Sequence, residues 1–161
     1  MNINRHTRKG FTLIEILIVV IILGILAAIV IPQFTNASKE AKQSALTSMV
    51  QSLRSQIALF KLQHNDYLPG CNPVSNTTFA EATFWDQMTL FSDLAGGTQA
   101  AKDATHVYGP YMQSKPVNPL NSSSTIAEAA AVGVGFVYDY NAGAGSGKLW
   151  GVDATGALIN Q

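Results

Sequence analysis

The strongest pattern along the chain is one long apolar run near the amino end. Sixteen residues, Ile16 through Ile31, carry no polar side chain, and the five residues from Phe11 to Glu15 extend the run to 21 with a single acid. At about 1.5 Å per helical residue, such a run covers roughly 30 Å, the thickness of the hydrocarbon layer of a bilayer. The pattern predicts a membrane-spanning helix over residues 11–31.

Beyond Pro32 the pattern changes to one apolar position every three or four residues, which is typical of an amphipathic helix. This predicts a helical continuation over residues 32–65, with a kink at Gly24 and Pro32, because glycine weakens a helix and proline removes one of its hydrogen bonds. The helix should stop near Asn65 and Asp66, ahead of Pro69 and Gly70. The predicted stripe consists of Phe34, Ala37, Ala41, Ala45, Met49, Leu53, Ile57 and Phe60.

The rest of the chain, residues 66–161, predicts a small head. Residues 70–106 mix short apolar patches with Gly, Ser, Thr and Asn, and favour a variable loop with one short helix around 85–95. An edge strand is expected at 107–112 and a stiff loop at 116–121. Alternation and turn residues over 135–160 predict an antiparallel β-meander. We therefore expect an α+β fold, in which one long helix packs on a small antiparallel sheet.

The distribution of charge predicts the orientation of the chain in the membrane and argues against a nucleic-acid partner. Residues 1–10 contain Arg5, His6, Arg8 and Lys9 and no acid, so the positive-inside rule predicts a cytoplasmic leader. The net charge is zero without long runs of either sign, and no nucleic-acid partner is expected. The single cysteine, Cys71, excludes an intrachain disulfide.

Three kinds of segment fit a basic leader followed by an apolar run: a signal peptide removed on the far side, a plain anchor, and an anchor clipped on the cytoplasmic side. Glu15 separates them, because an acid within a membrane helix costs up to about 2.5–3.5 kcal/mol and is usually kept for a partner. A cut after Gly10 would create a charged amine on Phe11, one helical turn from Glu15. The alternative is an acid that only snorkels to the cytoplasmic surface.

The stretch Lys9-Gly10-Phe11-Thr12-Leu13-Ile14-Glu15 resembles the class III signal of type IV pilins and type II secretion pseudopilins. The resemblance covers residues 8–34. It implies that a prepilin peptidase cleaves between Gly10 and Phe11 and methylates the new amine of Phe11, and that Glu15 sets the subunit register in a filament. It also implies several partners: other copies of the chain, related pseudopilins, an inner-membrane assembly platform and the lipid bilayer. The expected location is the bacterial inner membrane, then a periplasmic filament.

In the head, the stretches GPYMQSKPVNPLN and GFVYDYN resemble the major pseudopilin of type II secretion more than a fibre-forming pilin. The chain departs from both patterns, since Cys71 is alone and the loop 141–147 lacks the acids that calcium requires. Asp139 and Asp153 are the only nearby acids. We expect no metal and no other cofactor, with calcium a minority alternative.

These patterns predict a structural subunit of a type II secretion pseudopilus acting in protein export, and not an enzyme. One alternative is a type IV pilus subunit for adhesion, motility or DNA uptake. Another is a membrane-anchored periplasmic binding module that never polymerises.

The remaining candidates for chemistry have simpler interpretations. The stretch AGAGSGK at 142–148 lacks the residues and the helix of a phosphate loop, and predicts a hairpin turn. Pairing Cys71 with His64 or His106 gives no recognisable nucleophile, so no catalytic residue is expected. The aromatic residues are expected in the core or in cross-strand pairs, namely Trp85, Trp150, Tyr138 and Tyr140.

Overall fold

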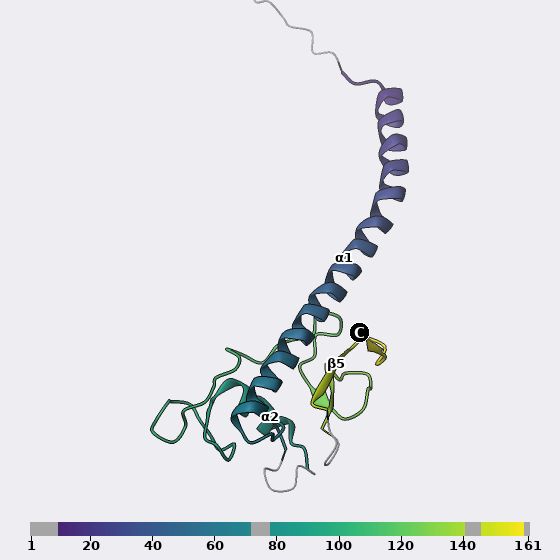
Figure 1. The fold of residues 1–161 in the computed structure, drawn as a ribbon. Coiled ribbons are helices and arrows are strands. Elements are labelled where there is room, and N and C mark those ends of the chain that lie inside the picture. The colour runs from purple at the N-terminus through teal and green to yellow at the C-terminus, as the bar shows by residue number, and fades with distance from the viewer. Residues whose placement is uncertain (1–9, 72–77, 141–145, 160–161) are drawn as a thin grey trace, which may run out of the picture. The chain divides into compact units, whose positions relative to one another are not determined.

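The computed structural model describes residues 10–71, 78–140 and 146–159. The chain forms two compact units, Met1–Glu40 and Ala41–Gln161, which we call the amino-terminal unit and the head unit. Helix α1, Leu13–Gln63, contributes residues to both units (Figure 1). The predicted domain limits at residues 10, 31 and 65 stay predictions.

The amino-terminal unit consists of α1 and the residues that precede it. α1 passes through Gly24 and Pro32 without a break in the helix, so the kink predicted at these two residues stays a prediction. Every described residue of this unit, from 10 to 40, is exposed. By length and composition alone, α1 is the one helix among the described residues that could cross a membrane.

Within the head unit, α1 buries one face in the core. The buried positions follow one another at spacings of four and three and are Leu46, Val50, Leu53, Ile57 and Phe60. The predicted stripe was therefore wrong in its first half. Phe34, Ala37, Ala41 and Ala45 are exposed, and Met49 is only half-buried. Leu46 and Val50 take the core side one position further along. Leu46 buries more apolar surface there than Ala45 would, and Met49 still packs against the core from the side.

The end of α1 agrees with the prediction. The helix ends at Gln63, and Asn65 and Asp66 both have positive φ angles, 52° and 65°. The left-handed region is one that asparagine and aspartate tolerate better than most residues, and a left-handed residue ends a helix. The Asp66 amide closes the turn by donating to the Lys61 carbonyl at 2.9 Å.

The main sheet contains four strands in the order β3-β4-β5-β6, which are Ile126–Ala127, Phe136–Asp139, Lys148–Val152 and Leu158–Ile159. The predicted meander is confirmed, since β4, β5 and β6 pair antiparallel. The expected α+β fold is confirmed, and one edge of the sheet adds a parallel pair, since β3 pairs parallel with β4. The chain from β3 to β4 loops back through residues 128–135, which brings the two strands side by side in the same direction.

The connection over residues 70–106 holds more structure than predicted. Its helix, α2, spans Glu81–Thr89, which is several residues earlier than the expected 85–95. It is followed by a two-stranded antiparallel sheet of β1, Phe91–Ser92, and β2, Thr98–Gln99. Leu90 has an extended backbone (φ −112°, ψ 172°), which ends the helix. Two residues later, Ser92 pairs with Tyr108. The strand predicted at 107–112 is reduced to this single bridge at Tyr108.

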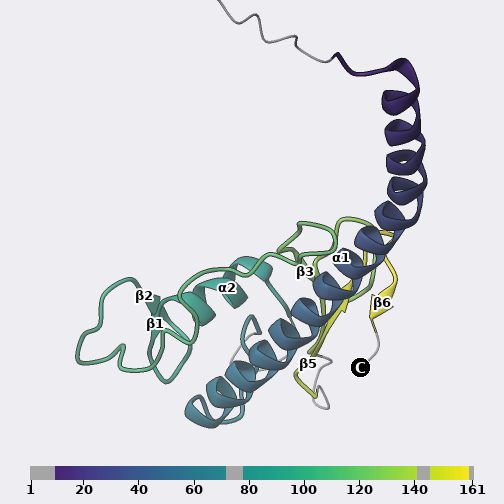
Figure 2. The same cartoon turned by 90° about the horizontal axis from the view of Figure 1, so that it is seen from above.

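Figure 2 shows α2 between the β1–β2 hairpin and the four-stranded sheet. It contributes Phe84, Trp85 and Met88 to the same core that α1 enters. Tyr138 is buried, whereas Tyr140 and Trp150 are half-buried, and Trp150 pairs with Val137 across the strands. The predicted aromatic core is thereby confirmed in its main members.

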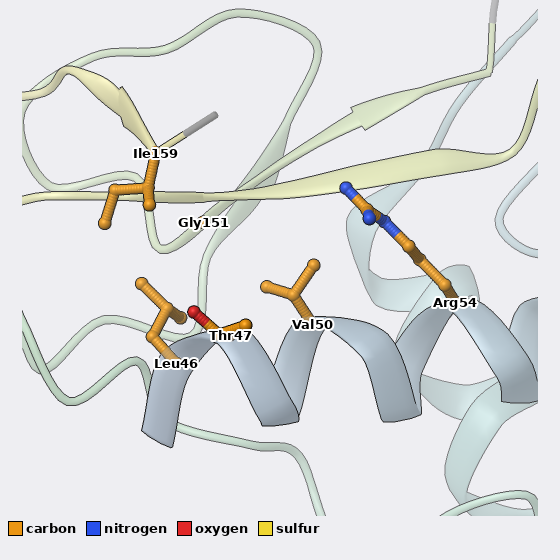
Figure 3. A pocket seen from close by; sticks show the side chains of 6 residues that line it. All are labelled: Leu46, Thr47, Val50, Arg54, Gly151 and Ile159. Atoms are coloured by element: carbon orange, nitrogen blue, oxygen red, sulfur yellow. The ribbon is translucent and has the colours of Figure 1, made fainter. Parts of the chain in front are cut away.

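Helix α1 lies very close to β5. A side chain at Gly151 would meet Leu46, and the Arg54 Nε atom donates to the Leu149 carbonyl oxygen at 2.8 Å. Figure 3 shows Arg54 reaching from α1 to β5, beside a shallow surface pocket lined by Leu46, Thr47, Val50, Arg54, Gly151 and Ile159. A glycine on β5 thus allows α1 to approach closely, and an arginine on α1 adds a hydrogen bond between the helix and the strand.

Candidate processing and assembly site

The predicted cleavage point lies just ahead of α1. Gly10 and Phe11 precede the first helical residue, Leu13, and both are exposed. The peptide bond between them is therefore outside the helical hydrogen-bonding pattern. A protease binds its substrate in an extended form, and no helix has to unwind here for such a contact.

Thr12 and Glu15 form the amino-terminal cap of α1. The Glu15 Oε2 atom accepts hydrogen bonds from the Thr12 amide at 2.8 Å and from the Thr12 hydroxyl at 2.7 Å. In return the Glu15 amide donates to Thr12 Oγ1 at 3.3 Å, and the Ile16 amide donates to the Thr12 carbonyl. This reciprocal arrangement is a capping box. Its signature, Thr-x-x-Glu, stands in the sequence but did not enter the sequence-based prediction.

The capping box gives Glu15 a local role that does not need a second chain. An acid in the first turn also interacts favourably with the helix dipole. Both bonds to Thr12 use the same oxygen, Oε2, while Oε1 has no hydrogen-bond partner among the described residues. The carboxylate can therefore cap its own helix and still present an oxygen to an external cation. The roles predicted for Gly10, Phe11 and Glu15 stay predictions.

The apolar side chains of the amino-terminal unit lie uncovered in this single chain. Phe11 and Leu13 are each 84% exposed, and Ile31 is 64% exposed. Soluble monomers rarely expose a contiguous apolar surface of this extent, and one that does is usually covered by lipid or protein.

The acids considered for calcium lie apart. Asp139 pairs with Lys148, whereas Asp153 follows the far end of β5, five residues along the strand. At about 3.3 Å per residue the two positions are roughly 16 Å apart, which is too far to share one ion. In the described part of the chain no three His, Cys, Asp or Glu side chains gather as metal ligands would. The expectation of no cofactor stays a prediction.

Asp139 and Asp153 already accept hydrogen bonds. The Ser146 hydroxyl donates to Asp139 Oδ2 at 2.8 Å. Asp153 Oδ1 accepts from the Thr155 hydroxyl at 2.7 Å, the Thr155 amide at 2.8 Å and the Ala157 amide at 2.9 Å. These bonds, led by that of the Thr155 hydroxyl, lower the pKa of Asp153. The carboxylate thus organises the turn before β6.

The residues weighed as a nucleophile and base do not form a catalytic pair. Cys71 is buried, and burial raises the pKa of its thiol to about 11. His64 instead contacts Ser92, at 3.0 Å between Nε2 and Oγ, and both residues are fully buried. A substrate carbonyl has no access to such a serine. His106 lies in another loop and contacts Asp103. Of the glycine-rich stretch, residues 142–145 fall outside the described residues.

Comparison with known proteins matches residues 5–31 to the family described as "Prokaryotic N-terminal methylation motif". The type II secretion system core protein G of Pseudomonas aeruginosa is 40% identical over 63 residues, which are 39% of this chain and 44% of that protein. The protein of the same name from Dickeya chrysanthemi is 43% identical over 61 residues, 37% of this chain and 39% of that protein.

A third relative is the type IV narrow pilus major component PilA5 of Thermus thermophilus. It is 39% identical over 66 residues, which are 41% of this chain and 56% of that protein. The chain thus spans about half or less of the length of these curated relatives. No solved structure matches the chain. The amino-terminal segment of this chain thus carries the N-terminal methylation motif and is similar to the corresponding segments of the type II secretion core protein G and of the pilus component PilA5.

Proposed function

We propose that this chain is a structural subunit of a type II secretion pseudopilus. One observation carries the proposal. The side chains of residues 10–40 are all exposed and largely apolar, and from Leu13 onward these residues form a helix with a capped acid, Glu15, at its start. The apolar surface of such a segment has to be buried, by lipid while the segment is in the membrane and by other subunits after it leaves.

In the proposed cycle, the chain inserts with its leader in the cytoplasm, where a prepilin peptidase clips it before Phe11. An inner-membrane platform then draws it from the bilayer into a periplasmic filament. Contacts between copies are head-to-tail and do not close, which produces an open helical polymer. Each square ångström of apolar surface moved from water into the filament core contributes about 25 cal/mol.

Glu15 becomes buried in this core, where an unpaired charge would cost several kcal/mol. The amine of Phe11 on a neighbouring copy compensates for it. The subunit performs no reaction of its own, and its work in export is mechanical.

Crosslinking in the membrane segment tests the polymer. Cys71 is first replaced by Ala, and one cysteine is placed at Ile18 of the full chain in cells. A filament subunit gives a crosslinked dimer, whereas a binding module that never polymerises gives none. The same cysteine in a chain that also carries Glu15→Val is the matched control, and it should lose the dimer while remaining in the membrane. Equal amounts of dimer in both chains would contradict the pairing.

A second candidate is a type IV pilus subunit, because the relative from Thermus thermophilus is named as a pilus component. Two measurements on cells lacking this chain separate the candidates. Loss of an exported protein from the medium, with surface fibres unchanged, supports the pseudopilus. Loss of surface fibres with export intact supports the pilus.

A further inference from the structure

His64 lies just past the end of α1, and its side chain is completely buried. Its Nδ1 atom is 2.9 Å from the carbonyl oxygen of Phe60, and its Nε2 atom is 3.0 Å from Ser92 Oγ. A carbonyl only accepts, so Nδ1 carries the proton, and Nε2 accepts from the serine hydroxyl. The contacts therefore select one neutral tautomer of the imidazole.

The contact joins two separate parts of the head unit. On one side stands the last turn of α1, where the ring of Phe60 stacks on the imidazole at 3.8 Å between centroids. On the other side stands β1, and the backbone of Ser92 exchanges two hydrogen bonds with Tyr108. His64 meets this hairpin through its contact with Ser92 and through a hydrogen bond with the backbone of Asp93.

The surroundings do not favour a charge on the ring. The rings of Tyr108 and Tyr111 lie 5.1 and 6.3 Å from the imidazole. Asp93, next to Ser92, is the acid whose charge acts on His64 and raises its pKa, and one of its oxygens already accepts from the Gly97 amide at 2.8 Å. Burial is the largest influence on the ring and lowers the pKa of His64.

We propose that the His64–Ser92 contact is an acid-sensitive latch, which holds the β1–β2 hairpin and the Tyr108 segment against the end of α1. Neutral His64 fills the site between Phe60 and the two tyrosines. A proton on Nε2 ends its acceptance from Ser92, so that the serine oxygen has to turn and accept instead, and it places a charge in an apolar site. The protonated ring regains water only when the hairpin moves away.

The opening is confined to this part of the head unit. The other side-chain hydrogen bonds that hold the hairpin and the Tyr108 segment run from Gln87 Nε2 to the Gly96 carbonyl at 2.8 Å and from the Tyr111 hydroxyl to Gln63 Oε1 at 2.6 Å, and neither reaches the larger sheet. The two strands of the hairpin contain two residues each, whereas β3–β6 pair in a separate sheet. The direction of the pH effect follows from the linkage between proton binding and stability. A histidine whose pKa is lowered by folding stabilises the closed form fully above about pH 6.5, and this stabilisation is lost as the pH falls toward the folded pKa. A bacterial periplasm exchanges protons with the medium, so the latch would make the head surface responsive to external acid.

Hydrogen exchange on the full mature chain in detergent micelles tests the latch. Opening constants for the amides of Ser92, Asp93 and Tyr108 are compared at pH 7.5 and 5.5, after correction for the intrinsic exchange rate. We expect these constants to rise about tenfold at pH 5.5, since proton uptake by an ordinary histidine in the open form changes by that factor. At both pH values the opening constants of the hairpin amides should be larger than those of the β4 and β5 amides, which shows that the hairpin opens without global unfolding.

His64→Gln removes the titration and should abolish the tenfold dependence, whatever its absolute opening constant. His106→Gln, at the histidine of an exposed loop, is the matched control and should behave like the unchanged chain. A pH-independent hairpin in the unchanged chain, or a tenfold change that persists in His64→Gln, would overturn the latch.

Should the His64→Gln chain fail to fold, a direct nuclear magnetic resonance titration of the unchanged protein decides the matter. The latch requires the His64 ring of the closed form to remain neutral at pH 5.5. A ring that charges near pH 6.5 while the Ser92 and Tyr108 amides stay protected contradicts it.

Discussion

Gly151 of β5 packs directly under Leu46 of α1. A Cβ atom at residue 151 would lie 2.6 Å from Leu46 Cδ2 and 2.8 Å from its Cγ. Real carbon atoms do not approach so closely, so the absence of a side chain at 151 sets how near the helix comes to the strand.

Gly151→Ala should therefore destabilise the head unit by about 1–3 kcal/mol through overpacking, and lower the melting temperature by several degrees. Thermal unfolding of the full chain in detergent, followed by near-ultraviolet circular dichroism, measures this. In a Leu46→Ala background the same substitution should cost less, because the clashing atoms are gone. An equal cost in both backgrounds would show that packing against Leu46 is not the cause.

Asn118 joins the loop at 116–121 to the sheet. Its side-chain amide donates to the carbonyls of Gly135 and Val152, at 2.7 Å each, and its Oδ1 accepts from the Leu120 amide at 2.9 Å. After Asn118→Ala the Gly135 carbonyl still accepts from the Val152 amide, and the Val152 carbonyl still accepts from Asn121, each at 3.2 Å. The Leu120 amide loses the acceptor that Asn118 Oδ1 supplies, and the substitution should cost about 1–3 kcal/mol in all. Chemical denaturation of the full chain checks the loss. Gln113→Ala, at an exposed position of the same connection, should change stability by less than about 0.5 kcal/mol.

The two roles of Glu15 can be separated by a pair of substitutions. Glu15→Val removes both the cap and the charge, so it should leave membrane insertion intact and impair filament assembly. Glu15→Gln keeps a side chain that serves in a capping box but carries no charge. If pairing with an amine drives assembly, both variants fail; electron microscopy of filaments and membrane fractionation show this. Normal filaments from Glu15→Gln would mean that the acid serves the cap alone.

Processing makes a prediction about mass. The chain recovered from cells should begin at Phe11 and weigh one methyl group more than residues 11–161. Intact-mass spectrometry measures this, with a strain lacking the prepilin peptidase as control, where the chain should begin at Met1. A mature chain that begins beyond Ile31 would instead indicate an ordinary signal peptide.

Cys71 should be protected from alkylation. Burial raises the pKa of its thiol to about 11, against an ordinary value near 9, so the folded chain holds the proton more tightly than the unfolded chain does. The stability linked to this proton is present below about pH 9 and is lost as the pH rises toward 11. At pH 8, iodoacetamide should label the unfolded chain many times faster than the native chain, as peptide mass spectrometry would show. Equal rates would mean that the loop around Cys71 opens readily.

Local patterns in the sequence sufficed for the elements whose signal lies within a short stretch. The apolar run and the stripe that follows it predicted α1 and its end at Asn65 and Asp66, since helix periodicity and left-handed residues act over a few positions. Alternation and turns likewise predicted β4, β5 and β6. The Thr12–Glu15 cap was equally local and could have been predicted from its Thr-x-x-Glu spacing.

The tertiary structure decided whatever depends on contacts between distant residues. The fit of Leu46 against Gly151 decided which side of α1 faces the core. Leu46 and Val50 lie on that side, instead of Ala45 and Met49. Three further features depend on contacts between residues far apart in sequence. They are the parallel pairing of β3, the early start of α2 and the burial of His64 beside Ser92. Such contacts depend on the packing of whole elements, which no short window of the sequence contains. The sequence by itself determined an apolar amino-terminal helix with a capping box and a processing motif. Only the tertiary structure determined which polar groups of the head unit are buried.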